Sequence, residues 1–286
     1  MIVAGIHIGN RNIHVALLEI GQPQINYVKA QILDSHAPTP GVPAKYVMPL
    51  CLKKSELVEQ AYAEALKLGN IKRSDVLRVW ASGSSGKLVK FADHYIPDAV
   101  GSAHGVLLKC RTSRTVIDVG AEECQVFKMS QEGKILDYAV SERGAMGMGI
   151  FSDSMARAMN MTIAEMSESS LTSTRSIFTS GRYEIFGESQ HVLINKEIPK
   201  NDLARAVYEA VATNVAAVAQ TIGLADDVAV IGGMAKNKGF VEALKRVLGK
   251  DLQEPHNPQF VCAFGTAVAA AAEVVDEEIR TKHSKK

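Results

Sequence analysis

Three glycine turns are the residues of this 286-residue chain best suited to hold a nucleotide, the first two at its phosphates and the third at its nucleoside. Gly9 and Gly120 each end an apolar run, and Gly232-Gly233 follows a third. Because glycine has no Cβ, backbone N–H groups in such turns can approach a phosphate closely. A tight structural turn is the alternative for each one taken alone. The three together, in this order, predict a nucleotide site.

Acidic residues beside the second turn are the candidates for chemistry. Asp118 precedes Gly120 by two residues, where its carboxylate can hold a Mg²⁺-bound water near the phosphates. Glu122 or Glu123 is a candidate base or holds a water. The alternatives are an Asp that caps its own turn and a solvated Glu. We predict that Asp118 and Glu122 are catalytic and that Asp118 is the metal residue. The matching position in the first half is His7, which cannot serve a hard cation as a carboxylate does, so ATP hydrolysis is doubtful.

Small and polar residues around these turns are the candidate contacts to a nucleotide. Ser84 follows a strand-like run, and Lys236 and Asn237 open a helix, although turn and surface roles are the alternatives. We predict that the nucleotide contacts are Gly9, Asn10, Arg11, Asn12, Gly83, Ser84, Gly120, Ala121, Gly232, Gly233, Met234, Lys236 and Asn237.

The elements that must position these turns follow one plan used twice. Apolar runs joined by the glycine turns predict a strand hairpin, and helical periodicity follows in each half. Hairpins exclude a purely parallel sheet, so we expect duplicated α/β domains with mixed sheets and a nucleotide cleft between them. We expect strands at 2–9, 12–18, 27–33, 76–81, 115–120, 124–129, 134–140 and 228–231, and helices at 55–69, 149–160, 202–222, 240–248 and 265–275.

The predicted domain limits follow from these elements. Residues 1–110 form the first domain, which a C-terminal helix at 264–276 completes. Residues 111–263 form the second domain, and the stretch at 277–286, which ends in a basic cluster at 280–286, is predicted to be a disordered tail.

Composition narrows the function classes. Apolar residues make up 47% of the chain and charged residues 22%, and the net charge is +1. A balance of this kind does not favour nucleic acid or an acidic membrane as a partner. No apolar run approaches the roughly 20 residues of a membrane helix, and Met1 leads directly into a strand-like run without a basic leader. We therefore expect a cytoplasmic protein.

Six segments carry a resemblance to a known family. They resemble the BadF/BadG/BcrA/BcrD ATPase family, which includes activators of 2-hydroxyacyl-CoA dehydratases, ATPase subunits of benzoyl-CoA reductase and N-acetylglucosamine kinases. The resemblance spans about residues 2–275. Its segments are 81–87, 115–122, 186–189, 231–239, 255–259 and 263–267.

This resemblance implies a fold, ligands and partners. The fold would be actin-like and sugar-kinase-like, of the ribonuclease H-like type, with ATP and Mg²⁺ bound between two domains. Gln259 would join the nucleotide contacts through the match at 255–259. An activator of this family dimerises around one [4Fe–4S] cluster held by two Cys from each subunit, and ATP hydrolysis drives an electron into a partner enzyme.

The chain departs from the family pattern at its chemical residues. The first phosphate motif has His7 and His14 in place of its Asp and Lys. The two cluster cysteines fall on Gly144 and on or near Tyr183, and neither residue can ligate iron. None of the four cysteines forms a C-x-x-C pair. We expect no [4Fe–4S] cluster, and a cluster rebuilt from Cys110 and Cys124 is the alternative.

Three functions remain open. In the first, the chain is an ATP-binding, cluster-free subunit or activation factor of an acyl-CoA reductase or dehydratase-type redox complex. It would work as a homodimer or paired with a related ATPase subunit. Alternatively, it is an active ATPase or a small-molecule kinase. The third possibility is a structural subunit that binds no nucleotide. ATP binding and turnover discriminate between these three.

Overall fold

A computed structural model describes most of the chain. The described residues are 1–20, 29–32, 54–141, 148–175, 177, 198–225 and 227–284. Several predictions lie outside them: the extended residues 27, 28 and 33, the cluster-loop position Gly144, the second cluster position Tyr183, the 186–189 segment, and Cys51.

The chain divides into two compact units. The first comprises Met1–Arg111, Glu132–Lys134 and Phe260–Lys286, and the second comprises Thr112–Gln131 and Ile135–Gln259. The return of the C-terminal segment makes the first unit discontinuous in sequence, and Glu132–Lys134 interrupts the second.

The first unit contains a five-stranded mixed sheet with the order β3-β2-β1-β4-β5. β1 pairs antiparallel with β2 and parallel with β4, so the sheet joins a hairpin to parallel strands. The strands are β1 (Ile2–Ile8), β2 (Ile13–Glu19), β3 (Lys29–Ile32), β4 (Val76–Ser82) and β5 (His94–Tyr95), and the helices are α1 (Lys54–Gly69), α2 (Asp98–Lys109) and α8 (Val261–His283).

The second unit repeats this plan in a sheet with the order β10-β9-β6-β7-β8. β6 pairs antiparallel with β7 and parallel with β9, as β1 does with β2 and β4. The predicted duplication into two mixed α/β sheets is confirmed. The strands are β6 (Thr115–Val119), β7 (Cys124–Met129), β8 (Ile135–Val140), β9 (Val228–Ile231) and β10 (Leu252–Gln253), and the helices are α3 (Met148–Ala158), α4 (Ile163–Leu171), α6 (Lys200–Ile222) and α7 (Lys238–Leu248).

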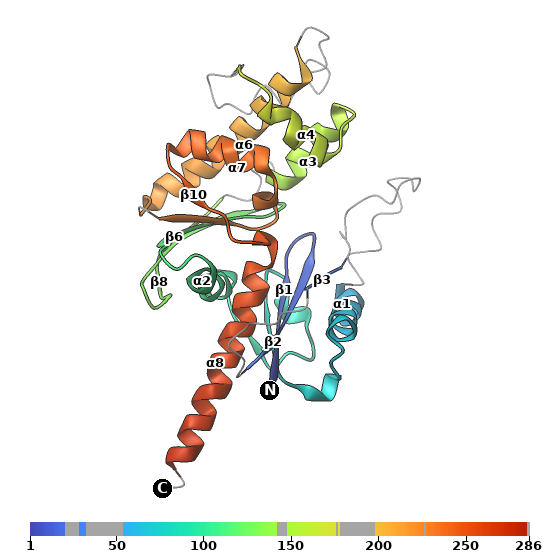
Figure 1. Ribbon diagram of the computed structural model, residues 1–286, viewed down its shortest axis with the longest axis vertical. Helices are drawn as coiled ribbons and strands as arrows, with labels where there is room; N and C mark the ends of the chain where they lie inside the picture. The colour runs from blue at the N-terminus through green and yellow to red at the C-terminus, as the bar shows by residue number, and fades with distance from the viewer. Residues whose placement is uncertain are drawn as a thin grey trace. The chain divides into compact units, whose positions relative to one another are not determined.

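Alternation along β1 and β2 builds two core layers in the first unit. Ala4, Ile6 and Ile8 pack with α1 on one face, whereas Val3 packs with α8 on the other. A strand sends successive side chains to opposite faces, so an apolar run of this kind is buried on both sides. Figure 1 shows α1 and α8 flanking this sheet.

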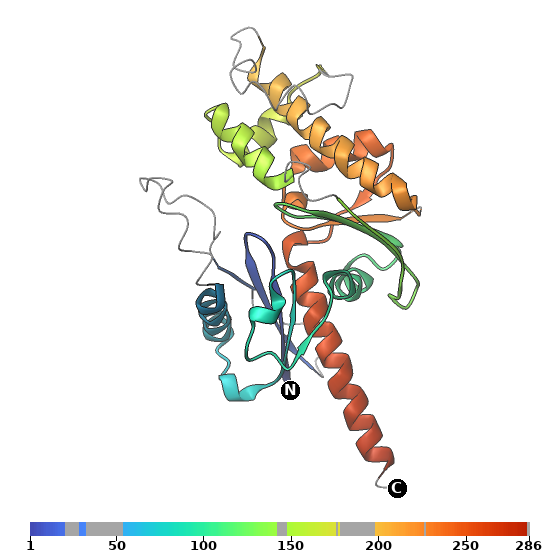
Figure 2. The ribbon, with the colours of Figure 1, turned by 180° about the vertical axis from the view of Figure 1, so that it is seen from behind.

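The second unit buries one large apolar cluster between its sheet and its helices. Val119, Val126 and Val230 contribute from the strands, and Val207 and Leu244 contribute from α6 and α7. Figure 2 shows α6 and α7 stacked over the strands of this unit. Local signals set the helix ends: Thr162 and Glu165 form a capping box at α4, and Gly249 ends α7 in the left-handed conformation.

Helix α2 was not predicted from the sequence. Its residues Gly101 and Gly105 have poor helix propensity, costing about 1 kcal/mol each relative to Ala. The physical reason for them lies in α8, which packs tightly on α2. A Cβ at Gly101 would lie 2.7 Å from the Thr266 hydroxyl oxygen, and a Cβ at Gly105 would collide with the Val261 carbonyl. The tertiary contact therefore outweighs the local preference.

Helix α8 differs from the sequence prediction at both ends. It begins at Val261 and continues to His283, so the prediction of a disordered tail is wrong for residues 277–283. Ion pairs support the extension: Arg78 on β4 contacts Glu277 at 3.0 Å, and Glu278 and Lys282 lie one helical turn apart.

The same helix bears on the membrane prediction. Among the described residues, one helical stretch, Pro258–His283, is long and apolar enough to cross a membrane by length and composition, although no such run was expected. Within the protein, 61% of its most apolar window is buried. A core helix passes this test as well, so the stretch is weak support for a membrane span.

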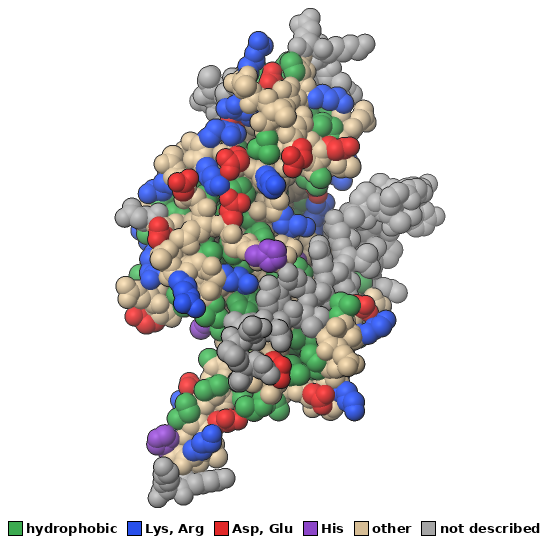
Figure 3. Space-filling view, in the orientation of Figure 1, with side chains coloured by type: hydrophobic (Ala, Val, Ile, Leu, Met, Phe, Trp, Pro, Cys, Tyr) green, Lys and Arg blue, Asp and Glu red, His purple; other side chains and the backbone are tan. Residues whose placement is uncertain are grey.

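Charged side chains of both signs are interspersed on the face drawn in Figure 3. The mixture agrees with the net charge of +1 and with the absence of a basic run outside the C-terminal stretch. On that face, no large field of one sign is available to attract a polyanion.

Candidate functional site

The first candidate phosphate turn joins β1 to β2. The Gly9 N–H donates to the Asn12 carbonyl at 3.0 Å, which closes the turn. The loop after β4 lies against it, because the Ser84 hydroxyl donates to Asn10 Oδ1 at 3.1 Å. Gly83 has φ +104° and packs so closely on the Ile8 backbone that a Cβ would collide with it. The structure therefore brings predicted residues of two separate segments together.

Lys54 was missed by the sequence analysis. Its Nζ lies 3.4 Å from the Ser85 hydroxyl, and it lines a small hollow with Gly9, Arg11 and Asn12. Two cationic side chains beside a glycine turn suit an anionic ligand. No spacing rule points to Lys54, since it comes from the start of α1, far along the chain from the turn.

His7 and His14 face each other across the β1–β2 hairpin. They are direct partners in the strand register, and their rings stack with centroids 6.1 Å apart at an interplanar angle of 12°. Phe260 packs edge-on against His14 at 4.8 Å. His7 and His14 therefore form one cross-strand pair.

The second candidate phosphate turn joins β6 to β7 and is closed in the same way. The Gly120 N–H donates to the Glu123 carbonyl at 2.9 Å. The first residues of α3 lie against this turn, because the amides of Gly149 and Ile150 both donate to the Ala121 carbonyl at 3.1 Å. Glu122 is exposed at the turn.

Asp118 sits directly beside Gly232. Asp118 pairs with Ile231 in the parallel register of β6 and β9, so the residue after Ile231 lies next to the carboxylate. Gly232 has φ +90°, and a Cβ there would lie 2.5 Å from Asp118 Oδ1. A positive φ and this close approach both require glycine. The second and third predicted turns therefore form one site in the second unit.

Part of the third turn is used internally. The Gly232 N–H donates to the Pro258 carbonyl at 3.1 Å, so this amide is already engaged within the protein. Gly233 faces open space, Lys236 is exposed and Met234 is buried. Next to Pro258, Gln259 Oε1 is buried without a hydrogen-bond partner among the described residues. A buried acceptor without a partner is rare in proteins, so Gln259 suits a donor on a ligand.

The Asn237 side chain makes hydrogen bonds within the protein. Its Oδ1 accepts from the Phe240 N–H at 3.1 Å and caps α7, and its Nδ2 donates to the Tyr208 hydroxyl at 2.6 Å. Burial raises the pKa of Tyr208, so this hydroxyl stays protonated. Both polar atoms of the Asn237 amide are engaged. These hydrogen bonds explain the presence of Asn at this position without a contact to a nucleotide.

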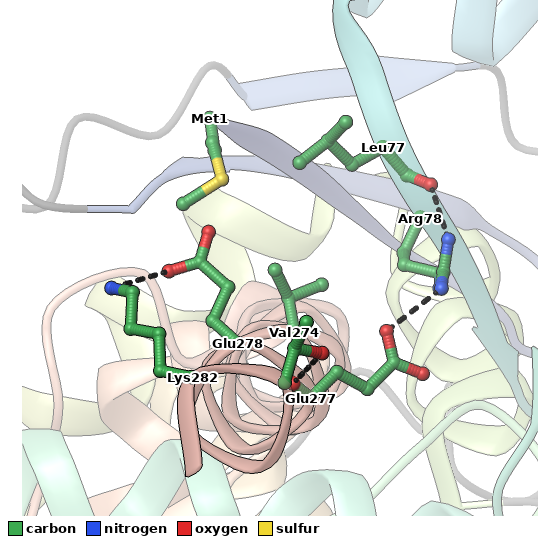
Figure 4. A pocket seen from close by; sticks show the side chains of 8 residues that line it. Met1, Leu77, Arg78, Val274, Glu277, Glu278 and Lys282 are labelled. Atoms are coloured by element: carbon green, nitrogen blue, oxygen red, sulfur yellow. Dashed lines mark hydrogen bonds and ion pairs between the residues drawn. The ribbon is translucent and has the colours of Figure 1, made fainter. Parts of the chain in front are cut away.

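A groove of about 460 Å³ lies elsewhere on the first unit (Figure 4). It is lined by Met1, Leu77 and Arg78 at the beginnings of β1 and β4, together with the outer part of α8. β1 and β4 are parallel, and the predicted turns follow their opposite ends. This groove is therefore separate from the candidate nucleotide residues.

The chain is similar in sequence to proteins of a known family. The model of the BadF/BadG/BcrA/BcrD ATPase family matches residues 45–270. The chain belongs to this family. The 2-hydroxyisocaproyl-CoA dehydratase activator of Clostridioides difficile is 27% identical over 232 residues, 80% of this chain and 85% of the relative. The activator of lactoyl-CoA dehydratase of Anaerotignum propionicum is 29% identical over 213 residues, 74% and 82% of the two chains.

A solved structure shows the fold of this family. The activator of the 2-hydroxyisocaproyl-CoA dehydratase from Clostridium difficile, solved with bound ADPNP, superposes with a TM-score of 0.82 over 98% of both chains at 22% identity. The predicted actin-like, sugar-kinase-like class is confirmed by this likeness together with the two mixed sheets.

The described cysteines of this family member are buried. Cys124 lies on β7 near Asp118; burial, and secondarily the Asp118 charge, raises the pKa of its thiol, which disfavours the thiolate that iron requires. Burial also raises the pKa of Cys110 at the end of α2. Within the described part of the chain, one group of three side chains is spaced to hold a metal. Cys262 is the one cysteine in that group.

Proposed function

We propose that the chain is an ATP-binding member of the BadF/BadG/BcrA/BcrD ATPase family that works without a [4Fe–4S] cluster of its own. In this proposal it is a subunit or activation factor of an acyl-CoA reductase or dehydratase-type redox complex in the cytoplasm. It works as a homodimer or beside a related ATPase subunit. The names of its relatives, which are activators of acyl-CoA dehydratases, support the kind of partner.

One observation carries the nucleotide part of this proposal. Asp118, Gly120 and Gly232 lie together at the ends of adjacent strands, and Gln259 supplies a buried acceptor close to them. A carboxylate beside a glycine turn suits a hydrated Mg²⁺, and the open space at Gly233 suits a nucleoside. When bound, Mg²⁺ would supply charge neutralisation at the phosphates. Asp118 would hold it through water.

The cluster-free part rests on the family resemblance of the sequence, in which the two cluster cysteines fall on Gly144 and on or near Tyr183. The described cysteines are buried, Cys110 and Cys262 in the first unit and Cys124 in the second. A subunit that keeps the nucleotide residues but lacks the cluster ligands fits a role beside a cluster-bearing partner. His7 in place of a carboxylate fits slow or absent hydrolysis.

An active ATPase or small-molecule kinase is the second candidate. The observation that favours it is the intact turn of the second unit, where Asp118 lies next to the Gly120 turn and Glu122 is exposed to act as a base. Measured turnover separates it from the first proposal.

Asp118→Ala tests the nucleotide proposal. We expect the chain to bind ATP in the presence of Mg²⁺ without turnover, and Asp118→Ala to weaken this binding about tenfold. Binding in the presence of a chelator should be equal in the two proteins, because Asp118 acts through the metal. Titration calorimetry measures affinity, and phosphate release measures turnover.

Glu122→Ala is the matched control, since it removes an exposed carboxylate from the same turn. It should leave ATP affinity unchanged. Turnover that both substitutions abolish would favour the ATPase or kinase, and no ATP binding at all would leave only a structural subunit.

A further inference from the structure

Three potential metal ligands from three elements converge in the first unit. They are His7 on β1, Asp98 at the first residue of α2 and Cys262 near the start of α8. One ligand atom of each lies within 4.8 Å of the others. The residues are 91 or more positions apart in pairs, so only the fold brings them together.

One carboxylate oxygen of Asp98 has no hydrogen bond among the described residues that would explain its place in this cluster. His7 Nδ1 lies 3.9 Å from Asp98 Oδ1, which is beyond hydrogen-bond distance. Asp98 Oδ1 is itself buried and has no hydrogen-bond partner among the described residues. Burying a carboxylate oxygen without a hydrogen bond is costly, and a bound cation would compensate it.

The backbone around the cluster leaves space for the sulfur. A Cβ at Gly101 would lie 3.3 Å from Cys262 Sγ and 3.2 Å from the Cys262 carbonyl. The thiol points to the Asp98 carbonyl at 3.6 Å. Gly101 of α2 therefore allows the Cys262 thiol of α8 to reach Asp98 at the beginning of α2.

A second layer of hydroxyl groups orients the ligands. The Ser82 hydroxyl lies 3.4 Å from His7 Nδ1, 3.5 Å from Cys262 Sγ and 2.9 Å from the Thr266 hydroxyl. Ser82 and Thr266 are fully buried. Outer partners of this kind fix the orientation of ligating side chains.

We propose that His7, Asp98 and Cys262 bind a divalent cation of the zinc class. Imidazole and thiolate select Zn²⁺ over Mg²⁺ and Ca²⁺, which prefer oxygen ligands. Zn²⁺ binds nitrogen ligands at about 2.0 Å and sulfur ligands at about 2.3 Å. Small side-chain rotations must therefore bring the three ligand atoms closer to one another when the ion binds. The Cys262 thiol releases its proton to solvent on binding. Three protein ligands leave one position open to water or a ligand oxygen.

A zinc site would explain why position 7 carries a histidine. A residue that cannot serve a hard cation becomes a suitable ligand once a thiolate and a carboxylate lie beside it. The ring also borders the first phosphate turn, since a Cβ at Gly9 would lie 3.4 Å from His7 Nε2. All three ligands belong to the first unit, so the inference does not depend on ATP binding.

Zinc titration of the reduced, metal-free full chain tests the site. In competition with a chromophoric chelator, we expect one Zn²⁺ per chain, undisturbed by excess Mg²⁺. Cys262→Ser and His7→Gln should each weaken binding by at least about 100-fold. Cys110→Ser, which removes another buried thiol of the same unit just after the end of α2, should leave zinc binding unchanged.

Co²⁺ gives a second measurement that reports the ligand directly. The wild-type chain and Cys110→Ser should show thiolate-to-cobalt charge-transfer absorption, and Cys262→Ser should not. If Cys262→Ser fails to fold, Asp98→Asn with the thiol retained provides the affinity comparison. Zinc binding that survives in Cys262→Ser, or a cobalt complex without the thiolate band, would overturn the proposal.

Discussion

Gly265→Ala should destabilise the first unit by about 3 kcal/mol. A methyl group at this position would collide with the Gly101 carbonyl oxygen and the Gly105 amide nitrogen across the α2–α8 contact. Alanine gains about 1 kcal/mol of helix propensity over glycine, so the two effects oppose each other. The collision should win, because both opposing atoms are backbone and cannot rotate away. Denaturant unfolding measures the loss.

Ala272→Leu is the matched control on the same helix. It adds more volume than Gly265→Ala, but it does so at an exposed position of α8. We expect a change within about 0.5 kcal/mol for this variant. A Gly265→Ala protein as stable as the wild type would show that helix propensity governs α8 and that the tight contact does not.

Gly232→Ala should weaken ATP binding about 100-fold. Residue 232 needs φ +90°, which costs a non-glycine residue about 1–3 kcal/mol, and its Cβ would press on Asp118 Oδ1 and the Val119 carbonyl. The Asp118 carboxylate would have to move away from the β6–β7 turn. Titration calorimetry with ATP and Mg²⁺ measures the affinity.

Gly233→Ala is the control at the adjacent position. Gly233 has φ −64°, and a Cβ there would meet nothing within 4 Å. The fold should therefore accept alanine, and the ATP affinity should stay within about threefold of the wild type. Equal losses in the two variants would contradict the role given to the contact between residue 232 and Asp118.

Much of the fold follows from apolar runs and turns in the sequence. β6, β7 and β9 are buried runs that end at glycine or at a return strand, so period and turn chemistry predict them. α2 does not follow, because Gly101 and Gly105 have poor helix propensity and only the partner helix explains them. The end of α8 also depends on contacts with β4 that no local signal reveals.

The candidate site divides in the same way. Gly9, Asp118, Gly120 and Gly232 are predictable, since each lies where a strand meets a turn. Lys54 and Asp98 are not, because their approach to the first turn and to Cys262 depends on how α1 and α2 pack. The sequence predicts nucleotide contacts for Gly232 and Asn237. In the structure the Gly232 amide donates to Pro258, and the Asn237 side chain bonds to Phe240 and Tyr208.

Native mass spectrometry after anaerobic reconstitution measures nucleotide binding and cluster content in one experiment. The chain is incubated with iron, sulfide and a reductant, followed by ATP and Mg²⁺, and one spectrum then reports both ligands. We expect a species that carries one ATP per chain and no [4Fe–4S] mass, either in the monomer or in a homodimer. A species that carries the cluster, or a chain that carries no nucleotide, would contradict the proposed function.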